Sequence, residues 1–264
     1  MKPLRTQLAA RRHPLTGGFT LVELMVAMAI SLFLIGGMLV VLQNVRSTYS
    51  TQTKLASLED SERLAMMLMS DVIQSAGYFP QPLSNTAAGE MPASNNFPGE
   101  AGSPAMTETA NTQGDTITVR FAADTTSPTL MNCMGQTAST PVDWENYFYV
   151  DPKGNLTCQV TNGATNAASN PVILATGLTT NTNATTDPPG MTILYGVTSG
   201  TASAPTCMDI YKTSAQMTAA DWPYVCAVKV TLTFVNPTPP PDGTKPTVSF
   251  TRVIAVMNMA GASA

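Results

Sequence analysis

A mostly apolar run of 24 residues, Phe19 to Leu42, is the feature that most limits what this 264-residue chain can fold into. About 20 residues of helix cross the hydrocarbon core of a bilayer, so the run is long enough to span a membrane. The run holds one ionisable side chain, Glu23, and directly follows Gly17 and Gly18. A carboxylate in a membrane span costs roughly 2.5–3.5 kcal/mol on insertion scales, so we expect Glu23 to have a function and a partner.

The partner that we expect for Glu23 is a backbone amine. Cleavage between Gly18 and Phe19 would create an α-ammonium group on Phe19, which could pair with Glu23 of a neighbouring copy and neutralise both charges. An ordinary signal peptide has an apolar core of about 7–15 residues followed by its cleavage site, whereas here the candidate cut precedes a longer run. A plain signal anchor has the right length but gives no reason for Glu23 or for the glycine pair.

The residues Gly18, Phe19 and Glu23 resemble the prepilin signature of type IV pilins and type II secretion pseudopilins. The resemblance implies that a prepilin peptidase cuts after Gly18, that Phe19 is then N-methylated, and that Glu23 guides packing of the subunit into a filament. One feature departs from the family pattern. The nearest arginine, Arg12, lies six residues before Gly18, whereas the family often has Lys or Arg directly beside the glycine.

The charge of the chain is distributed unevenly about the predicted cut. The leader, residues 1–18, holds four basic residues and no acid. Basic residues before a span keep that flank in the cytoplasm, so we expect the rest of the chain in the periplasm or outside the cell. Without the leader, 9 basic and 17 acidic residues remain, a formal net charge of −8. This charge disfavours contact with phosphate backbones, and nucleic acid is not an expected partner.

All four cysteines lie beyond the span, where an oxidising compartment favours disulfides. Four cysteines allow three pairings, and we favour Cys133–Cys158 and Cys207–Cys226 because each closes a modest loop. No CxxC spacing occurs, so we predict no metal site and no cofactor. The only histidine, His13, lies in the leader. Because histidine is the commonest general base, we expect no catalytic residue and no enzymatic activity.

The apolar run is predicted to continue as an amphipathic helix. No proline or glycine occurs from residue 43 to 76, and apolar residues recur there near helical spacing. Gly77 is typical of a helix C-terminal cap. We therefore predict one helix over 19–76, with its first half in the membrane and its second half on a globular domain. Gly36 and Gly37 favour either a bend or close helix packing, and the sequence does not decide between them.

The remainder is predicted to be β-rich. Residues 81–114 are rich in Pro, Ser, Asn, Thr, Ala and Gly and suggest a long surface connection. Alternating apolar residues predict strands, of which the last two form a hairpin; the stretches are 116–121, 147–150, 172–175, 191–195, 228–234 and 248–256. This order predicts an α+β fold with the long helix packed on an antiparallel sheet. The expected divisions are the leader 1–18, a transmembrane and assembly helix 19–42, its amphipathic continuation 43–77 and a β-rich head 78–264.

Two groups of side chains in the head allow more than one interpretation. The carboxylates Asp143, Glu145 and Asp151 could form an acid pair or a calcium site, but their spacing matches no calcium loop, so we expect solvated surface. An aromatic cluster nearby is expected in the core rather than on a partner surface; it comprises Trp144, Tyr147, Phe148 and Tyr149.

A finer resemblance covers three segments of the chain. Residues 49–78, ending in Ala-Gly-Tyr, resemble the post-span helix of the PilW group of minor pilins, and 115–121 and 252–258 are similar to its first and last strands. Met257 stands where that last strand often has arginine. The resemblance implies a structural subunit with the pilin fold that primes type IV pilus assembly near the tip. The alternatives are a type II secretion minor pseudopilin of the GspJ group and an adhesin or DNA-uptake pilin.

The same resemblance implies where the protein acts and with what. It predicts a single-pass protein of the inner membrane with its C-terminal domain in the periplasm, which later enters a pilus on the cell surface. The implied partners are the inner membrane, the prepilin peptidase, other minor and major pilins and a pilus-tip adhesin.

Overall fold

The computed structural model describes residues 18–97, 106–108, 111–127, 129–181, 187–197, 210–237 and 246–257. Its contacts divide the chain into two compact units, Met1–Gln52 and Thr53–Ala264. Helix α1 (Leu21–Gln74) runs through both units, and every strand in the described part of the chain lies in the second. The last part of α1 is therefore an integral part of the β-rich unit.

Helix α1 is four residues shorter than the predicted helix, with 54 residues from Leu21 to Gln74. It is unbroken at Gly36 and Gly37. At its C-terminal end Gly77 has a φ of +73°, the left-handed conformation that glycine adopts without strain. The Gly77 N–H donates to the Arg120 carbonyl oxygen at 2.9 Å, which connects the helix end to a strand.

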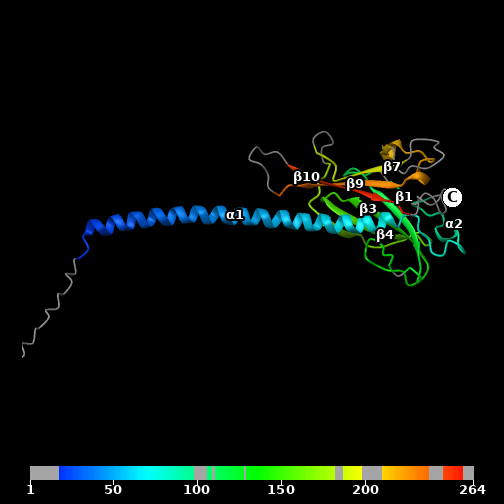
Figure 1. Cartoon of the computed structure of the whole chain (residues 1–264), viewed down its shortest axis with the longest axis horizontal. Helices are drawn as coiled ribbons and strands as arrows, with labels where there is room; N and C mark the ends of the chain where they lie inside the picture. The colour runs from blue at the N-terminus through cyan, green and yellow to red at the C-terminus, as the bar shows by residue number, and fades with distance from the viewer. Residues whose placement is uncertain are drawn as a thin grey trace, which may run out of the picture. The chain divides into compact units, whose positions relative to one another are not determined.

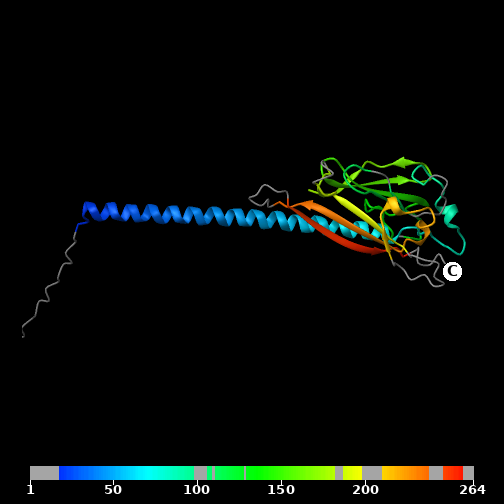
Figure 2. The ribbon, with the colours of Figure 1, turned by 90° about the horizontal axis from the view of Figure 1, so that it is seen from above.

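Two antiparallel sheets form the second unit (Figures 1 and 2). The first sheet has the order β1-β2-β3-β4-β5, with β6 also paired to β4. Its strands are β1 (Met106–Thr107), β2 (Ile117–Ala123), β3 (Val142–Val150), β4 (Asn155–Asn162), β5 (Ala167–Ala168) and β6 (Val172–Thr176). The second sheet has the order β10-β9-β7-β8, with β7 (Met191–Val197), β8 (Ile210–Lys212), β9 (Ala227–Val235) and β10 (Thr247–Ala255). The short helices are α2 (Ala87–Glu90), η1 (Ser214–Gln216) and η2 (Trp222–Tyr224). The predicted α+β class with antiparallel strands is confirmed.

All six predicted strand stretches overlap observed strands, and the last two pair as the predicted hairpin. The β9–β10 register is regular from Thr247 opposite Val235 to Ala255 opposite Ala227. Four strands were not predicted: β1, β4, β5 and β8. Three of these have only two or three residues, but β4 pairs with β3 over most of its length.

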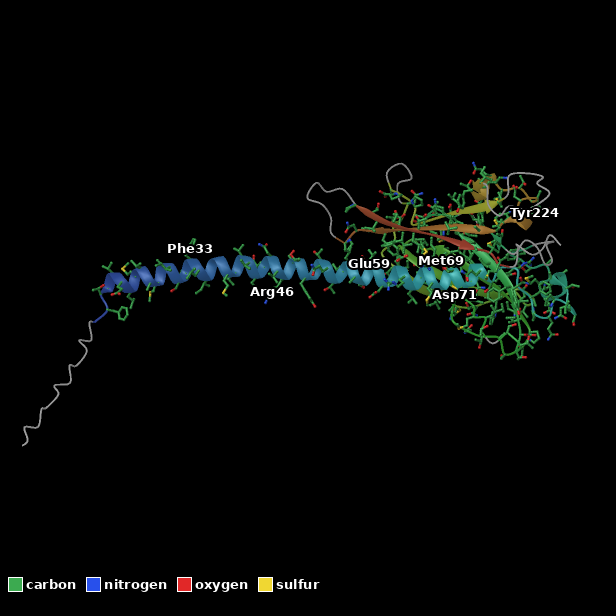
Figure 3. The ribbon with its side chains drawn as sticks, in the orientation of Figure 1. Phe33, Arg46, Glu59, Met69, Asp71 and Tyr224 are labelled. Carbon is green, nitrogen blue, oxygen red and sulfur yellow. A yellow bond between two sulfur atoms is a disulfide. The ribbon has the colours of Figure 1, made fainter. Side chains whose placement is uncertain are left out.

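The hydrophobic core unites both sheets with the last part of α1. Figure 2 shows the green strands of the six-stranded sheet above the yellow-to-red strands of the other sheet. Ala65, Met69 and Val72 of α1 are buried, as the helical spacing predicted. Val45 and Tyr49 continue the same apolar spacing towards the start of residues 43–76 but are exposed, so the predicted contact with the globular domain does not extend that far. The buried face of α1 therefore covers only its last turns, where Met69 lies in Figure 3.

The predicted surface connection 81–114 contributes to the interior, which corrects the interpretation of this segment. Met91, Phe97 and Met106 are fully or almost fully buried. Proline, serine and asparagine suggested exposure, but the apolar residues between them are buried. A composition rich in turn residues fixes local backbone conformation and does not determine which side chains are buried.

The prediction of solvated surface is wrong for Asp143 and Glu145, whose side chains are 3% and 0% exposed. Residues two apart on a strand lie on one face, and residues 92–97 cover this face. Asp151 is half-buried in a turn, where it accepts N–H bonds from Lys153 and Asn155 at 2.8 and 2.9 Å.

The aromatic cluster divides between the two faces of β3. Trp144 and Phe148 are buried in the core, as expected. Tyr147 and Tyr149 lie on the opposite face, where they are half-buried and their rings stack with centroids 4.8 Å apart. The core interpretation therefore holds for only two of the four rings.

Candidate assembly segment

The predicted cleavage position lies in exposed chain before the helix. Phe19 is 81% exposed, and the Gly18 Cα has free space on the side where a Cβ would stand. Helix α1 begins two residues later, at Leu21. Among the described residues nothing therefore shields the Gly18–Phe19 peptide bond from a protease.

Thr20 caps the start of α1, a role that the sequence analysis did not assign. The Thr20 Oγ1 atom accepts the N–H of Glu23 at 3.3 Å, and the Thr20 carbonyl accepts the N–H of Leu24 at 3.2 Å. Threonine three residues before glutamate is the capping-box spacing, and this pattern is the signal that could have identified the helix start.

The same geometry gives a local reason for an acid at this position. A carboxylate in the first turn of a helix interacts favourably with the helix dipole by about 0.3–1 kcal/mol. This gain is smaller than the roughly 2.5–3.5 kcal/mol that a carboxylate costs inside a membrane span. The helix dipole therefore offsets only part of the free-energy cost of placing the Glu23 carboxylate in a membrane span.

Glu23 has no counter-charge among the residues that the structure describes. The residue is exposed, and no side chain of the described residues bonds to its carboxylate. A compensating cation would therefore come from outside the described residues.

The first half of α1 presents an apolar surface on all sides. Its large apolar side chains are exposed, and Phe33, labelled in Figure 3, is 82% exposed. The one polar hydroxyl in mid-span is satisfied internally, because Ser31 Oγ donates to the Ala27 carbonyl at 2.7 Å. In the described part of the chain, α1 alone is long and apolar enough to cross a membrane. Such a surface requires lipid or other apolar helices around it.

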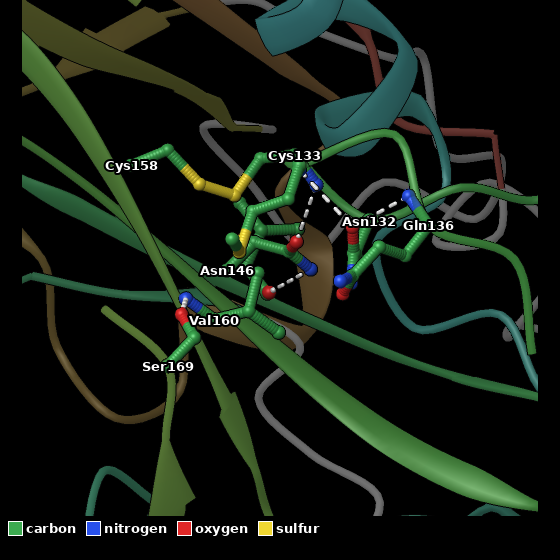
Figure 4. Close-up of a disulfide and its surroundings, with 9 residues drawn as sticks. Asn132, Cys133, Gln136, Asn146, Cys158, Val160 and Ser169 are labelled. Atoms are coloured by element: carbon green, nitrogen blue, oxygen red, sulfur yellow. Dashed lines mark hydrogen bonds between the residues drawn. A yellow bond between two sulfur atoms is a disulfide. The ribbon is translucent and has the colours of Figure 1, made fainter. Parts of the chain in front are cut away.

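Cys133 and Cys158 are joined by a disulfide in the structure, with their Cα atoms 6.4 Å apart (Figure 4). The Cys133 N–H donates to Asn146 Oδ1 at 2.8 Å, so a strand side chain also holds this loop. Cys226 is disulfide-bonded as well, while its predicted partner Cys207 lies outside the described residues. The described residues contain no group of three or more His, Cys, Asp or Glu side chains that could hold a metal ion.

The order of elements defines a class of protein: one long helix with an exposed apolar first half, continued by an antiparallel β unit. A family model, the prokaryotic N-terminal methylation motif, matches residues 16–39, which include Gly18, Phe19 and Glu23. The chain is thus type IV pilin-like in its N-terminal segment, which carries a prepilin methylation motif.

A type IV-like pilin from Thermus thermophilus is similar in structure, with 12% identity and a TM-score of 0.36, covering 77% of this chain and 98% of that one. No curated protein matches the sequence.

Proposed function

We propose that the protein is a minor pilin, a structural subunit that takes part in type IV pilus assembly after cleavage between Gly18 and Phe19. The observation that carries this proposal is the methylation motif on an exposed apolar helix whose acid, Glu23, has no counter-charge in the described chain. The resemblance of residues 49–78 to the PilW group supports the minor-pilin assignment and a place near the tip. The expected partners remain the prepilin peptidase, other minor and major pilins and a pilus-tip adhesin.

Assembly on this proposal is an exchange of surroundings for the apolar half of α1. In the inner membrane its side chains contact lipid, and in a filament they contact the helices of other subunits. Lipid tails are as apolar as leucine, so this exchange changes the hydrophobic free energy little. The pairing of Glu23 with the Phe19 ammonium of a neighbouring subunit then supplies the preference for the assembled state.

A substitution that removes only the charge tests this proposal. The Glu23→Gln variant keeps the side-chain length and the helical start, so we expect normal amounts in the membrane fraction. We expect its incorporation into sheared filaments to be lost. Ser31→Ala serves as the matched control, because Ser31 lies in the same span and bonds only within its own helix. Wild-type incorporation of Glu23→Gln would refute the pairing mechanism.

A type II secretion minor pseudopilin remains the second candidate, because the methylation motif is common to both classes. Complementation separates them. On the minor-pilin proposal the gene restores piliation to a strain that lacks its own minor pilins, and it does not restore protein secretion to a strain that lacks minor pseudopilins. The opposite result would favour the secretion system.

A further inference from the structure

Three charged side chains are buried together on the outer face of the six-stranded sheet, away from the hydrophobic core. Arg120 of β2 lies directly opposite Glu145 of β3, and Asp143 follows two residues away on the same face of β3. All three side chains are buried. Burial of this kind requires that the charges be balanced locally, because ionised groups are costly outside water.

The segment 92–97 forms the cover of this cluster and is held by it. Ser94 Oγ and Asn96 Nδ2 both donate to the Glu145 carboxylate, the second at 2.5 Å. Arg120 donates to the Pro92 carbonyl at 3.2 Å, and its guanidinium lies 4.2 Å from the centre of the Phe97 ring. Arg120 therefore binds the segment at its two ends, Pro92 and Phe97, and Glu145 binds it between them.

Asp143 differs from its neighbours because both of its carboxylate oxygens are buried without a hydrogen-bond donor among the described residues. Its Oδ2 atom lies against Gly163, where an added Cβ would collide with it, and the same Cβ would stand 3.0 Å from Glu145 Oε1. The two carboxylates thus converge over one glycine. Two ionised carboxylates this close repel one another, so the site needs one further positive charge.

We propose that Asp143 binds one proton and, as a neutral carboxyl group, donates a hydrogen bond to the Glu145 carboxylate. This shared-proton pair holds segment 92–97 against the sheet. The proton comes from solvent and returns to solvent when the segment opens. With it in place, one carboxylate balances Arg120 and the cluster is neutral. Among the described residues, the charged groups that face Asp143 are Arg120 from β2 and Glu145 from β3, whereas segment 92–97 and the turn at Gly163 present only neutral groups.

The electrostatics of the site agree with this geometry. Burial raises the pKa of Asp143 from 3.8 to about 7, Arg120 opposes the rise and Glu145 adds to it. An opened segment returns Asp143 to water and to its ordinary pKa. Between about pH 4 and pH 7 the closed form thus holds a proton that the open form lacks. Opening is favoured by about tenfold for each unit of rising pH in this window and levels off above it.

Hydrogen exchange of the full chain in detergent tests whether the Asp143–Glu145 pair holds this segment closed. Peptides covering residues 79–97 would be followed by mass spectrometry at pH 5, 6, 7 and 8.5, with rates corrected for intrinsic exchange. We expect protection of this segment to fall by at least tenfold between pH 5 and pH 7. The Asp143→Asn variant carries an amide that donates to Glu145 without titrating, so its protection should not change with pH.

Glu108 provides the control for other titrating groups, because burial also raises its pKa to about 7. The Glu108→Gln variant should keep the wild-type dependence in residues 79–97. A flat wild-type profile, or a sloping one in Asp143→Asn, would overturn the proposal. Calcium at 1 mM that restores protection at pH 8.5 would also overturn it, because the pair would then be a cation site. If Asp143→Asn does not fold, the wild-type and Glu108→Gln profiles decide the question.

Discussion

Two consecutive methionines on α1 allow a direct test of how the helix packs in the second unit. Met66 is fully buried in the hydrophobic core, whereas Met67 is 51% exposed. The substitutions Met66→Ala and Met67→Ala remove the same atoms and make the same small change in helix propensity. Any difference between them therefore reports the packing of the helix against the sheets.

The expected magnitude follows from burial. Truncation of a buried methionine to alanine costs about 2–5 kcal/mol, because it removes buried apolar surface and leaves a cavity. Surface substitutions usually stay within about 0.5 kcal/mol of zero. In a domain of this size 1 kcal/mol shifts Tm by about 2–4 °C, so Met66→Ala should lower Tm by roughly 4–20 °C and Met67→Ala by at most about 2 °C.

Intrinsic fluorescence during thermal unfolding of the detergent-solubilised chain measures both variants. The two tryptophans, Trp144 and Trp222, lie in the second unit and pack against its core, so the signal reports that unit. Equal Tm shifts for the two variants would contradict the assignment of the buried helix face. A larger shift for Met67→Ala would mean that the helix is rotated about its axis relative to the structure.

Two further predictions concern processing and the disulfides. Gly18→Ala should block or slow leader removal, because the resemblance makes Gly18 the residue before the cut; wild-type electrophoretic mobility beside an uncut standard would contradict this. Alkylation of the native chain should modify no thiol until a reductant is added, since Cys133, Cys158 and Cys226 are all disulfide-bonded. Thiols that react before reduction would show that at least one pair does not form in the cell.

Local patterns predicted the features that depend on neighbouring residues in the sequence. The β9–β10 hairpin followed from strict alternation of apolar and polar residues, and the helix end followed from Gly77, which adopts the expected left-handed conformation. Strand β4 could have been found in the same way, because Leu156, Cys158 and Val160 alternate with polar residues and are buried.

Features that depend on distant segments were not predictable from local pattern. Asp143 and Glu145 alternate with buried residues on β3, as surface acids do, and only the cover formed by residues 92–97 buries them. The contacts between this cover and β3 join residues 49 positions apart, such as Asn96 and Glu145, and helical or strand periodicity does not relate residues so far apart in the sequence. For the same reason the sequence placed residues 81–114 on the surface, although Met91 and Phe97 are buried there.

The free-energy balance at the helix start indicates how strongly one acid can bias assembly. A carboxylate in the span costs roughly 2.5–3.5 kcal/mol, and its position in the first turn, beside the Thr20 cap, recovers at most about 1 kcal/mol. On the proposed pairing, at most about 2 kcal/mol therefore remains for a neighbouring subunit to recover through its Phe19 ammonium, because the insertion cost is largest at the helix centre and Glu23 lies in the first turn. Because 1.4 kcal/mol corresponds to a factor of ten, this remainder favours the paired over the unpaired subunit by at most about thirtyfold. The exposed apolar surface of the span supplies no comparable bias, since lipid and neighbouring helices solvate it equally well.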